Sequence, residues 1–290
     1  MNIAFGTVTY KESFKYCLEF TESINKQDCK DFDVILLNDN LDKEELEKIS
    51  ASLRKNVLIR NGKRNCTPSG LRVQLIKYAK ENGYDLLVLG DFDDTFSHNR
   101  VSRIALAYEE KYSFYYNDIY TFDKQRKFFS SLSQYTKNIS DIIEHNYLGL
   151  SNTALNLKNI DVELIDKLNV RSVSVFDWFM YSILLKGGHI GKKIEDCKTY
   201  YRIHENNIAG ESQNTIEGIK KEINVKIDHY SQLRSIDTQF NKLLDYYKRL
   251  KLKIDNDKID ILNYVDSDNG YWWGRINSNK MREERTDCEY

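Results

Sequence analysis

Three carboxylates within four residues make the segment 91–94 (DFDD) the strongest chemical candidate in the sequence. It directly follows the apolar run Leu86–Leu89, which is predicted to be a buried strand. In open parallel sheets, ligands bind at the carboxyl ends of the strands. The mutual repulsion of these carboxylates favours a hard divalent cation, Mg²⁺ or Mn²⁺, that completes its shell with water and substrate phosphates. The plainer interpretation is an acidic turn that caps a helix starting near Ser97.

Polar residues also follow two other predicted strands. Asp39 comes directly after an apolar run, where an acidic residue often contacts a ribose or a base, although Asp is equally typical of an ordinary turn. The run Ile3–Val8 leads into hydroxyl and ring side chains that suit the same crevice: Thr7, Thr9 and Tyr10. Neither GxGxxG nor GxxxxGKS/T occurs, so a dinucleotide-binding Rossmann site and a P-loop are disfavoured.

The second half of the chain carries three further candidates. Arg202 and His204 lie two residues apart in the run YRIHENN, where a guanidinium and an imidazole suit a diphosphate and a metal ion. The alternative is a strand end with a solvated histidine. Asp177 opens an apolar stretch of helical spacing. It is either a functional carboxylate on a rigid element or a first-turn acid that the helix dipole favours.

The elements that must position these residues alternate in type along the first half of the chain. Four β-prone apolar runs are predicted to be strands: Ile3–Val8, Val34–Leu37, Val57–Ile59 and Leu86–Leu89. Three stretches between them have helical spacing: Phe14–Ile24, Glu44–Leu53 and Leu71–Ala79. This alternation indicates an α/β fold of βαβ units, Rossmann-like, with a mostly parallel central sheet and helices on its faces.

The rest of the chain is less regular. Further strands are predicted at Tyr112–Tyr116, Ile119–Phe122 and Asn146–Leu150, with a polar turn at Ser151–Ala154 and a short extended segment at Thr199–His204. Helical spacing recurs at Val175–Leu185, Ile216–Leu233 and Phe240–Leu252. We therefore expect one α/β domain over residues 1–211 and a helical extension over 212–290.

Composition narrows the functional class. The 290 residues include 43 basic and 44 acidic side chains, a formal net charge of −1, which argues against a nucleic-acid partner. No run approaches the roughly 18 apolar residues of a membrane span, and the N-terminus lacks the pattern of a signal peptide. Five cysteines without CxxC spacing fit reduced thiols. A cytoplasmic protein is expected. A peripheral position at the inner face of the membrane is an alternative, because the run 245–253 is basic and aromatic.

Taken together, these motifs resemble the family 2 glycosyltransferases of the GT-A fold over about residues 1–210. The DFDD segment resembles the family's DxD metal motif, and 201–210 (YRIHENNIAG) matches its YRxHxxNxxG run. The resemblance implies that Asp93 and His204 hold Mn²⁺ or Mg²⁺ and that Asp177 is the catalytic base, preceded by Phe176 where the family usually has Glu. It also implies nucleotide-sugar contacts from Thr7, Thr9, Tyr10, Asp39, Arg72, Asp91 and Arg202, and acceptor-side contacts from Ser151 and Asn152.

The activity expected from this resemblance is transfer of a sugar from a nucleoside-diphosphate sugar to a hydroxyl of a glycan, polysaccharide or lipid-linked acceptor. One base and one displacement imply inversion at the anomeric carbon. Two alternatives stay open. One is a haloacid-dehalogenase-like phosphatase with Asp91 as nucleophile and Asp93 as acid/base. The other is a nucleotide-sugar binder without chemistry. The C-terminal helices are expected to contact a membrane surface or a partner enzyme, with a solvated helix face as the plainer interpretation.

Overall fold

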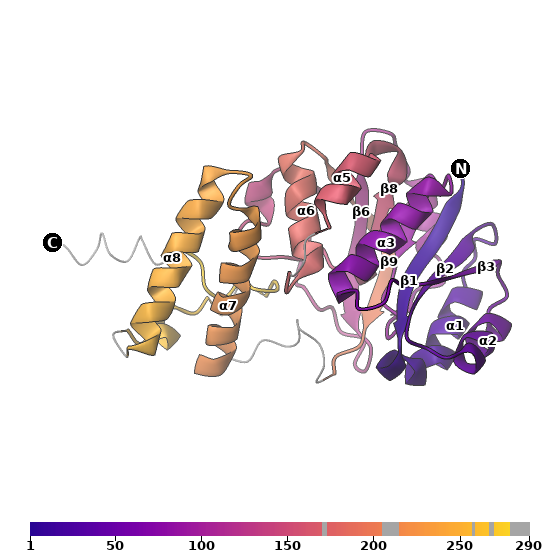
Figure 1. The fold of residues 1–290 in the computed structure, drawn as a ribbon, viewed down its shortest axis with the longest axis horizontal. Coiled ribbons are helices and arrows are strands. Elements are labelled where there is room, and N and C mark those ends of the chain that lie inside the picture. The colour runs from indigo at the N-terminus through magenta and orange to yellow at the C-terminus, as the bar shows by residue number, and fades with distance from the viewer. Residues whose placement is uncertain (170–172, 205–214, 257–258, 267–269, 279–290) are drawn as a thin grey trace. The chain divides into compact units, whose positions relative to one another are not determined.

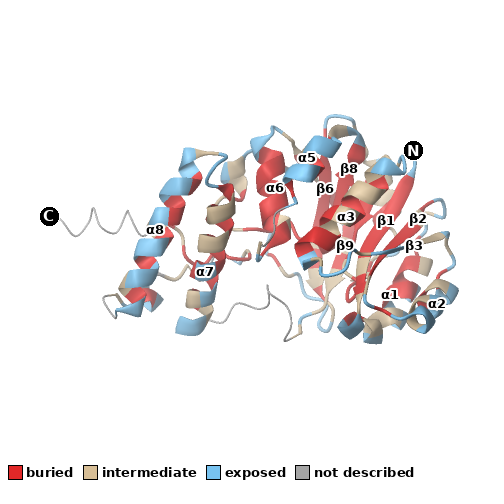
Figure 2. Ribbon diagram, viewed as in Figure 1, coloured by how far each residue is buried: buried red, intermediate tan, exposed pale blue. Residues whose placement is uncertain are grey.

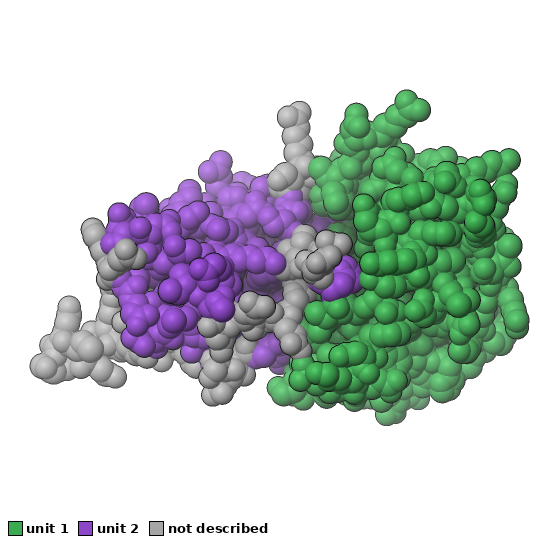
Figure 3. All heavy atoms as spheres, turned by 90° about the horizontal axis from the view of Figure 1, so that it is seen from below, with its two compact units in different colours: residues 1–138, 148–172, 183–203 green, residues 139–147, 173–182, 204–290 purple. Residues whose placement is uncertain are grey.

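The computed structural model describes residues 1–169, 173–204, 215–256, 259–266 and 270–278. They form two compact units (Figure 3). The first comprises residues 1–138, 148–172 and 183–203, and the second comprises 139–147, 173–182 and 204–290. The predicted domain boundary at 211/212 falls outside the described residues and stays a prediction.

A nine-stranded sheet forms the centre of the first unit (Figure 1). Its order is β3-β2-β1-β4-β8-β6-β9-β5, and β7 pairs with β9. The strands are β1 (Ile3–Tyr10), β2 (Asp33–Asp39), β3 (Val57–Asn61), β4 (Leu86–Leu89), β5 (Thr95–Phe96), β6 (Phe114–Thr121), β7 (Tyr135–Thr136), β8 (Thr153–Asn156) and β9 (Gly191–Tyr201). Strand β8 runs antiparallel to both β4 and β6, whereas β3, β2, β1, β4, β6 and β9 share one direction. The long strands are therefore mostly parallel, as expected.

Helices cover both faces of the parallel part of this sheet. The helices of the first unit are α1 (Cys17–Asn25), α2 (Lys43–Ser52), α3 (Pro68–Glu81), α4 (Arg100–Leu106) and α5 (Val162–Lys167). On β1, the Phe5 ring packs against Phe20 of α1, while a side chain at Gly6 would meet Leu75 of α3. Because neighbouring residues of a strand point to opposite faces, α1 and α3 cover opposite sides. Burial on both faces explains the uninterrupted apolar runs in β1, β2 and β4 (Figure 2).

Two predictions about the middle of the chain are wrong. The two strands predicted at 112–122 form the single strand β6, because a register shift against β9 between Asn117 and Asp118 lets pairing continue across this polar pair. No strand spans Asn146–Leu150. Asn146 makes an isolated bridge to Trp272, and Leu150 begins a 3₁₀ turn, which Asn152 caps by accepting from the N–H of Gly149. The predicted turn at 151–154 is thus half turn and half strand, since β8 begins at Thr153.

The second unit contains the predicted C-terminal helices. Helix α7 (Ile216–Leu233) packs against α8 (Thr238–Asp255), and each has a buried and an exposed side (Figure 2). The Tyr230 ring of α7 stacks with the rings of Phe240 and Tyr247 of α8. Helix α6 (Phe176–Lys186) begins in this unit and ends in the first. None of the described helices is both long and apolar enough to cross a bilayer.

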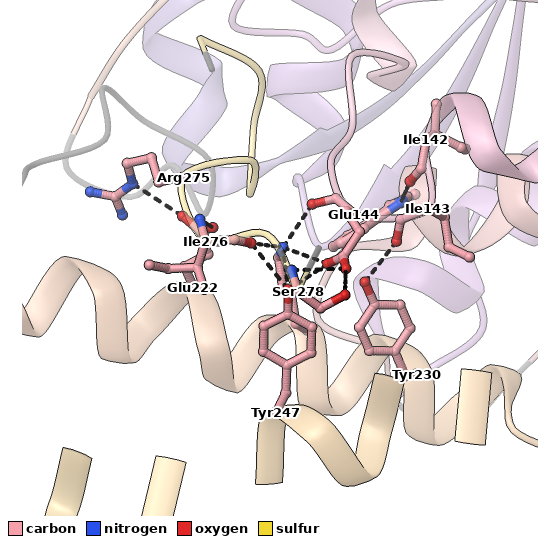
Figure 4. A network of polar contacts seen from close by, with 11 residues as sticks. Ile142, Ile143, Glu144, Glu222, Tyr230, Tyr247, Arg275, Ile276 and Ser278 are labelled. Atoms are coloured by element: carbon pink, nitrogen blue, oxygen red, sulfur yellow. Dashed lines mark hydrogen bonds and ion pairs between the residues drawn. The ribbon is translucent and has the colours of Figure 1, made fainter. Parts of the chain in front are cut away.

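A buried polar network joins four segments of the second unit (Figure 4). The Lys226 ammonium on α7 contacts the Glu144 carboxylate at 3.2 Å and donates to the Glu144 carbonyl at 2.7 Å, and both residues are buried. The Glu144 carboxylate also accepts from Tyr247 of α8 and from Ser278. Burial opposes ionisation, but Lys226 and these hydrogen bonds outweigh it and hold the pKa of Glu144 below its usual value. The network fastens the C-terminal segment 270–278 to the helices.

Candidate active site

The carboxyl ends of β1, β2 and β4 meet at one edge of the sheet. Tyr10 at the end of β1 is in register with Asp39 at the end of β2, and Gly6 is in register with Leu89 at the end of β4. A shallow cleft at this edge is lined by Thr7, Asp91 and Arg72, together with residues of β1, α3 and β4. The Thr7 hydroxyl is buried there and has no hydrogen-bond partner among the described residues. A buried hydroxyl of this kind is one that a ligand can satisfy.

Glycine is required where β4 turns into the acidic segment. A Cβ at Gly90 would lie 2.5 Å from the rings of both Phe5 and Phe96, closer than any real contact allows. These two rings pack edge to face at 5.1 Å beneath the turn. The aromatic core therefore sets how closely the backbone of Gly90 and Asp91 approaches the centre of the sheet.

The three carboxylates of the acidic segment differ in environment. Asp91 is 36% exposed, and one of its carboxylate oxygens lies 3.6 Å from the Arg72 guanidinium on α3. Asp94 is only 1% exposed. One of its oxygens accepts from the backbone N–H of Arg202 at 2.8 Å, and the other has no partner in the described part of the chain. Burial raises the pKa of Asp91 and, together with the charges of Asp93 and Asp91, raises the pKa of Asp94 well above its usual value.

The acidic segment is not the cap of a helix. Helix α4 begins at Arg100, and the residue in the capping position is Asn99. No carboxylate of the segment occupies the capping position of this helix, so the interpretation as an acidic helix cap is wrong.

The structure places Arg202 against this segment. Its Nε donates to the Asp93 carbonyl at 2.9 Å, and its guanidinium lies 3.7 Å from the centre of the Phe122 ring and 4.4 Å from that of Tyr16. A planar cation between two rings is held in a defined orientation. The structure therefore puts the predicted cation beside the predicted metal ligand, while its contact with a nucleotide sugar stays a prediction.

The side chain of Asp39 is partly exposed at the end of β2, whereas the side chain of its neighbour Asn38 is bonded within the turn. The Asn38 side chain is buried and is bonded to both the N–H and the carbonyl of Leu41 and to Asn61. Asp39 is partly exposed and accepts from the Asn40 amide at 2.7 Å. The turn is thus built by Asn38, so the carboxylate of Asp39 is not needed to form it.

Ser151 and Asn152 are buried supports of the site in this structure. The Ser151 hydroxyl accepts from the N–H of Asp91 at 3.3 Å. The Asn152 amide accepts from Gly149 and donates to the Asn117 carbonyl at 3.0 Å. Their predicted acceptor-side role stays a prediction.

Two of the predicted residues belong to the second unit. Asp177 is in the first turn of α6, where its carboxylate accepts from the N–H of Trp178 at 2.6 Å. His204 is partly buried and is the last described residue before 205–214, so the predicted motif positions Glu205 to Gly210 lie outside the described residues. The roles of Asp177 and His204 stay predictions.

Sequence reasoning missed Arg100. Its guanidinium is fully buried behind the acidic segment and donates to the carbonyls of Leu89 and Thr153. A charged residue at the start of a helix normally indicates a solvated position. Its only sequence signal is the apolar spacing of Val101 and Ile104 on the same short helix, which does not reveal burial of the arginine itself.

The donor set suits a hard divalent ion that the substrate completes. Among the described residues, no three His, Cys, Asp or Glu side chains come together as a preassembled metal centre. Mg²⁺ is usually held by one or two carboxylates plus substrate phosphates and water, and carboxylate oxygens also suit Mn²⁺. Asp93, together with the unpartnered oxygen of Asp94, fits this pattern.

Comparison with known proteins assigns the class. The sequence model of the family described as Glycosyl transferase family 2 matches residues 5–176. This match covers more than half of the chain, so the chain belongs to that family and is a glycosyltransferase of the GT-A fold. Membership excludes the phosphatase alternative. No curated protein sequence matches the chain.

Solved structures share the fold at low sequence identity. Staphylococcus aureus TarS 1–349 in complex with UDP-GlcNAc has a TM-score of 0.59 and 16% identity, covering 85% of this chain and 71% of that one. The mannosyltransferase PcManGT from Pyrobaculum calidifontis, in complex with GDP-Man and Mn²⁺, has a TM-score of 0.54 and 10% identity, covering 100% and 81%. GalNAc-T7 with UDP, GalNAc and Mn²⁺ has a TM-score of 0.53 and 12% identity, covering 99% and 55%.

Proposed function

We propose that this glycosyltransferase moves a sugar from a nucleoside-diphosphate sugar to an acceptor hydroxyl by a single, metal-dependent displacement with inversion. The observation that carries the proposal is the acidic segment at the carboxyl edge of the sheet, next to Arg72 and the unpartnered Thr7 hydroxyl. The nucleotide sugars in TarS and PcManGT, and the Mn²⁺ in PcManGT and GalNAc-T7, support the donor class and the metal.

Each predicted residue of the donor side has a role in this proposal. Thr7, Thr9, Tyr10 and Asp39 would bind the nucleoside, with Asp39 on the base or ribose. Arg72 would face the diphosphate, Arg202 would add positive charge beside it, and Asp91 would contact the nucleotide sugar. Asp93 and His204 would hold Mn²⁺ or Mg²⁺. When bound, the metal ion would stabilise the negative charge that develops on the leaving diphosphate.

The acceptor half of the reaction depends on the second unit. Asp177 would take the proton of the acceptor hydroxyl as that oxygen attacks the anomeric carbon. The proposed acceptor is a glycan or a lipid-linked sugar, met on the side of Ser151 and Asn152. The C-terminal helices would bring the enzyme to a membrane surface or a partner enzyme through the exposed basic side chains of α8.

Metal-dependent nucleotide binding tests the proposal. Calorimetry with UDP and with GDP should show tighter binding in Mn²⁺ than in EDTA, because the ion joins the carboxylates to the diphosphate. Asp93→Asn should remove most of this difference. Asp166→Asn, which changes an exposed carboxylate on α5, is the matched control and should leave it intact. Equal affinity with and without EDTA in the unaltered enzyme would show that the metal assignment is wrong.

A further inference from the structure

Arg100 holds together the two strand ends that lead into the acidic segment. Its Nη1 donates to the Leu89 carbonyl at 2.9 Å, at the end of β4, and its Nη2 donates to the Thr153 carbonyl at 3.1 Å, at the start of β8. The Phe96 ring lies against the guanidinium, 4.8 Å from its centre. Two strands that diverge towards the site are therefore tied by one rigid, planar group.

A second set of bonds carries this support to the backbone of Asp91. Arg100 Nε donates to the Asn117 side-chain oxygen at 2.9 Å, and the Asn117 amide donates to the Thr199 hydroxyl at 3.1 Å. That hydroxyl donates to the Ser151 carbonyl at 2.9 Å, and the Ser151 hydroxyl receives the N–H of Asp91. Arg100, Asn117 and Thr199 are all fully buried, so the chain of bonds is shielded from water.

We infer that Arg100 is a positioning residue for the metal and diphosphate site, acting through the strand ends and through Ser151 on the acidic segment. The inference rests on the proposed function, because it takes Asp91 as a contact of the nucleotide sugar and Asp93 as a ligand of the metal ion. Outer partners that orient metal ligands commonly govern metal affinity as well as shape.

The test is metal affinity in matched variants of the full chain. Arg100→Lys keeps the charge. A single ammonium, however, cannot donate to both carbonyls and to Asn117 as the planar guanidinium does. Thr199→Val keeps the shape and removes only the hydroxyl that joins Asn117 to Ser151. Arg103→Lys is the control, because Arg103 lies on the same helix but is exposed and pairs with Asp196 at 2.8 Å. Each variant is titrated with Mn²⁺ alone, and with UDP and GDP, well below its melting temperature.

Arg100→Lys should weaken Mn²⁺ binding by about 10- to 100-fold, with a smaller loss in the same direction for Thr199→Val and none for Arg103→Lys. Lower melting temperatures with unchanged Mn²⁺ and nucleotide affinity would overturn the inference and leave Arg100 a stability residue. If Arg100→Lys does not fold, the Mn²⁺ and nucleotide affinities of Thr199→Val test the inference on their own. If the unaltered enzyme binds no Mn²⁺, the metal assignment fails, and the UDP and GDP affinities of the variants still decide the role of Arg100.

Discussion

At the scale of the residue, environment separates carboxylates of the same chemical type. Asp91 is partly exposed and faces Arg72, Asp94 is buried and accepts from the backbone of Arg202, and Asp39 is partly exposed at the end of a neighbouring strand. The same carboxylate group is thus paired with a side-chain cation at Asp91 and bonded to the backbone at Asp94.

Asp177 is the residue to which the proposal gives a proton transfer. Asp177→Asn can still accept the N–H of Trp178 through its side-chain oxygen, so the start of α6 keeps its shape while the proton acceptor is lost. Turnover should fall by about 10²–10⁴ while UDP and GDP affinity is unchanged. Turnover is measured as nucleotide release, and NMR gives the anomeric configuration of the product. Near-normal turnover would place the base elsewhere, with Asp94 and Glu205 next to test. A product of retained configuration would exclude single displacement.

At the scale of the element, strand register decides which side chains share the site. The parallel pairing of β1 with β2 brings Tyr10 beside Asp39, although 28 residues separate them, and the pairing of β1 with β4 adds the acidic segment at the same edge. A slip of one residue would turn every side chain of a strand to the opposite face. The apolar faces buried under α1 and α3 prevent that slip.

This register gives a test for Asp39. Asp39→Ala should lower UDP or GDP affinity about tenfold or more, because a buried ligand group left without its acceptor costs roughly 1–3 kcal/mol. Mn²⁺ affinity should stay the same, since Asp39 is not in the acidic segment. Asp31→Ala, an exposed residue just before β2 and so at the opposite end of the strand, is the control. An unchanged dissociation constant would make Asp39 an ordinary turn residue.

At the scale of the whole molecule, the second unit carries a basic surface on helix α8. Lys242, Lys248, Arg249 and Lys251 are exposed on α8, and Leu252 among them is 62% exposed. The opposite side of the helix is buried, and Lys251 donates to Asn224 of α7 at 2.7 Å. Basic side chains around an exposed leucine suit an anionic lipid surface.

Vesicle binding tests this surface. The enzyme should sediment with vesicles that contain phosphatidylserine, and less so as salt rises, but not with pure phosphatidylcholine. Each basic residue near an anionic membrane contributes about 1 kcal/mol, so the double variant Lys248→Glu with Arg249→Glu should weaken binding at least about tenfold. The control reverses Lys43 and Lys48, two exposed lysines of α2. Binding that ignores lipid charge, or that survives the α8 variant, would contradict the proposal and favour a partner enzyme or a solvated face.

The amino-acid sequence by itself determined the class of the fold and the edge of the sheet where the chemistry lies. Apolar runs of strand length alternating with helical spacing require a βαβ sheet, and in such a sheet polar residues after successive strands must gather at one edge. For this reason we could predict the strands β1, β2 and β4 and the helix α3. Helices α7 and α8 could be predicted from the helical spacing of their apolar residues. The resemblance of DFDD and YRIHENN to family motifs added the activity.

Only the tertiary structure decided which polar side chains are available to a ligand and which are hydrogen-bonded within the protein. Asn38, Ser151 and Asn152 look as available as Asp39 in the sequence, yet their polar groups are bonded within the protein. Arg100 looks solvated and is fully buried. Burial and hydrogen bonding of a side chain depend on partners far along the chain, such as Thr153 for Arg100 and Asn117 for Asn152. No local pattern records those partners, because they are set by how the strands pair.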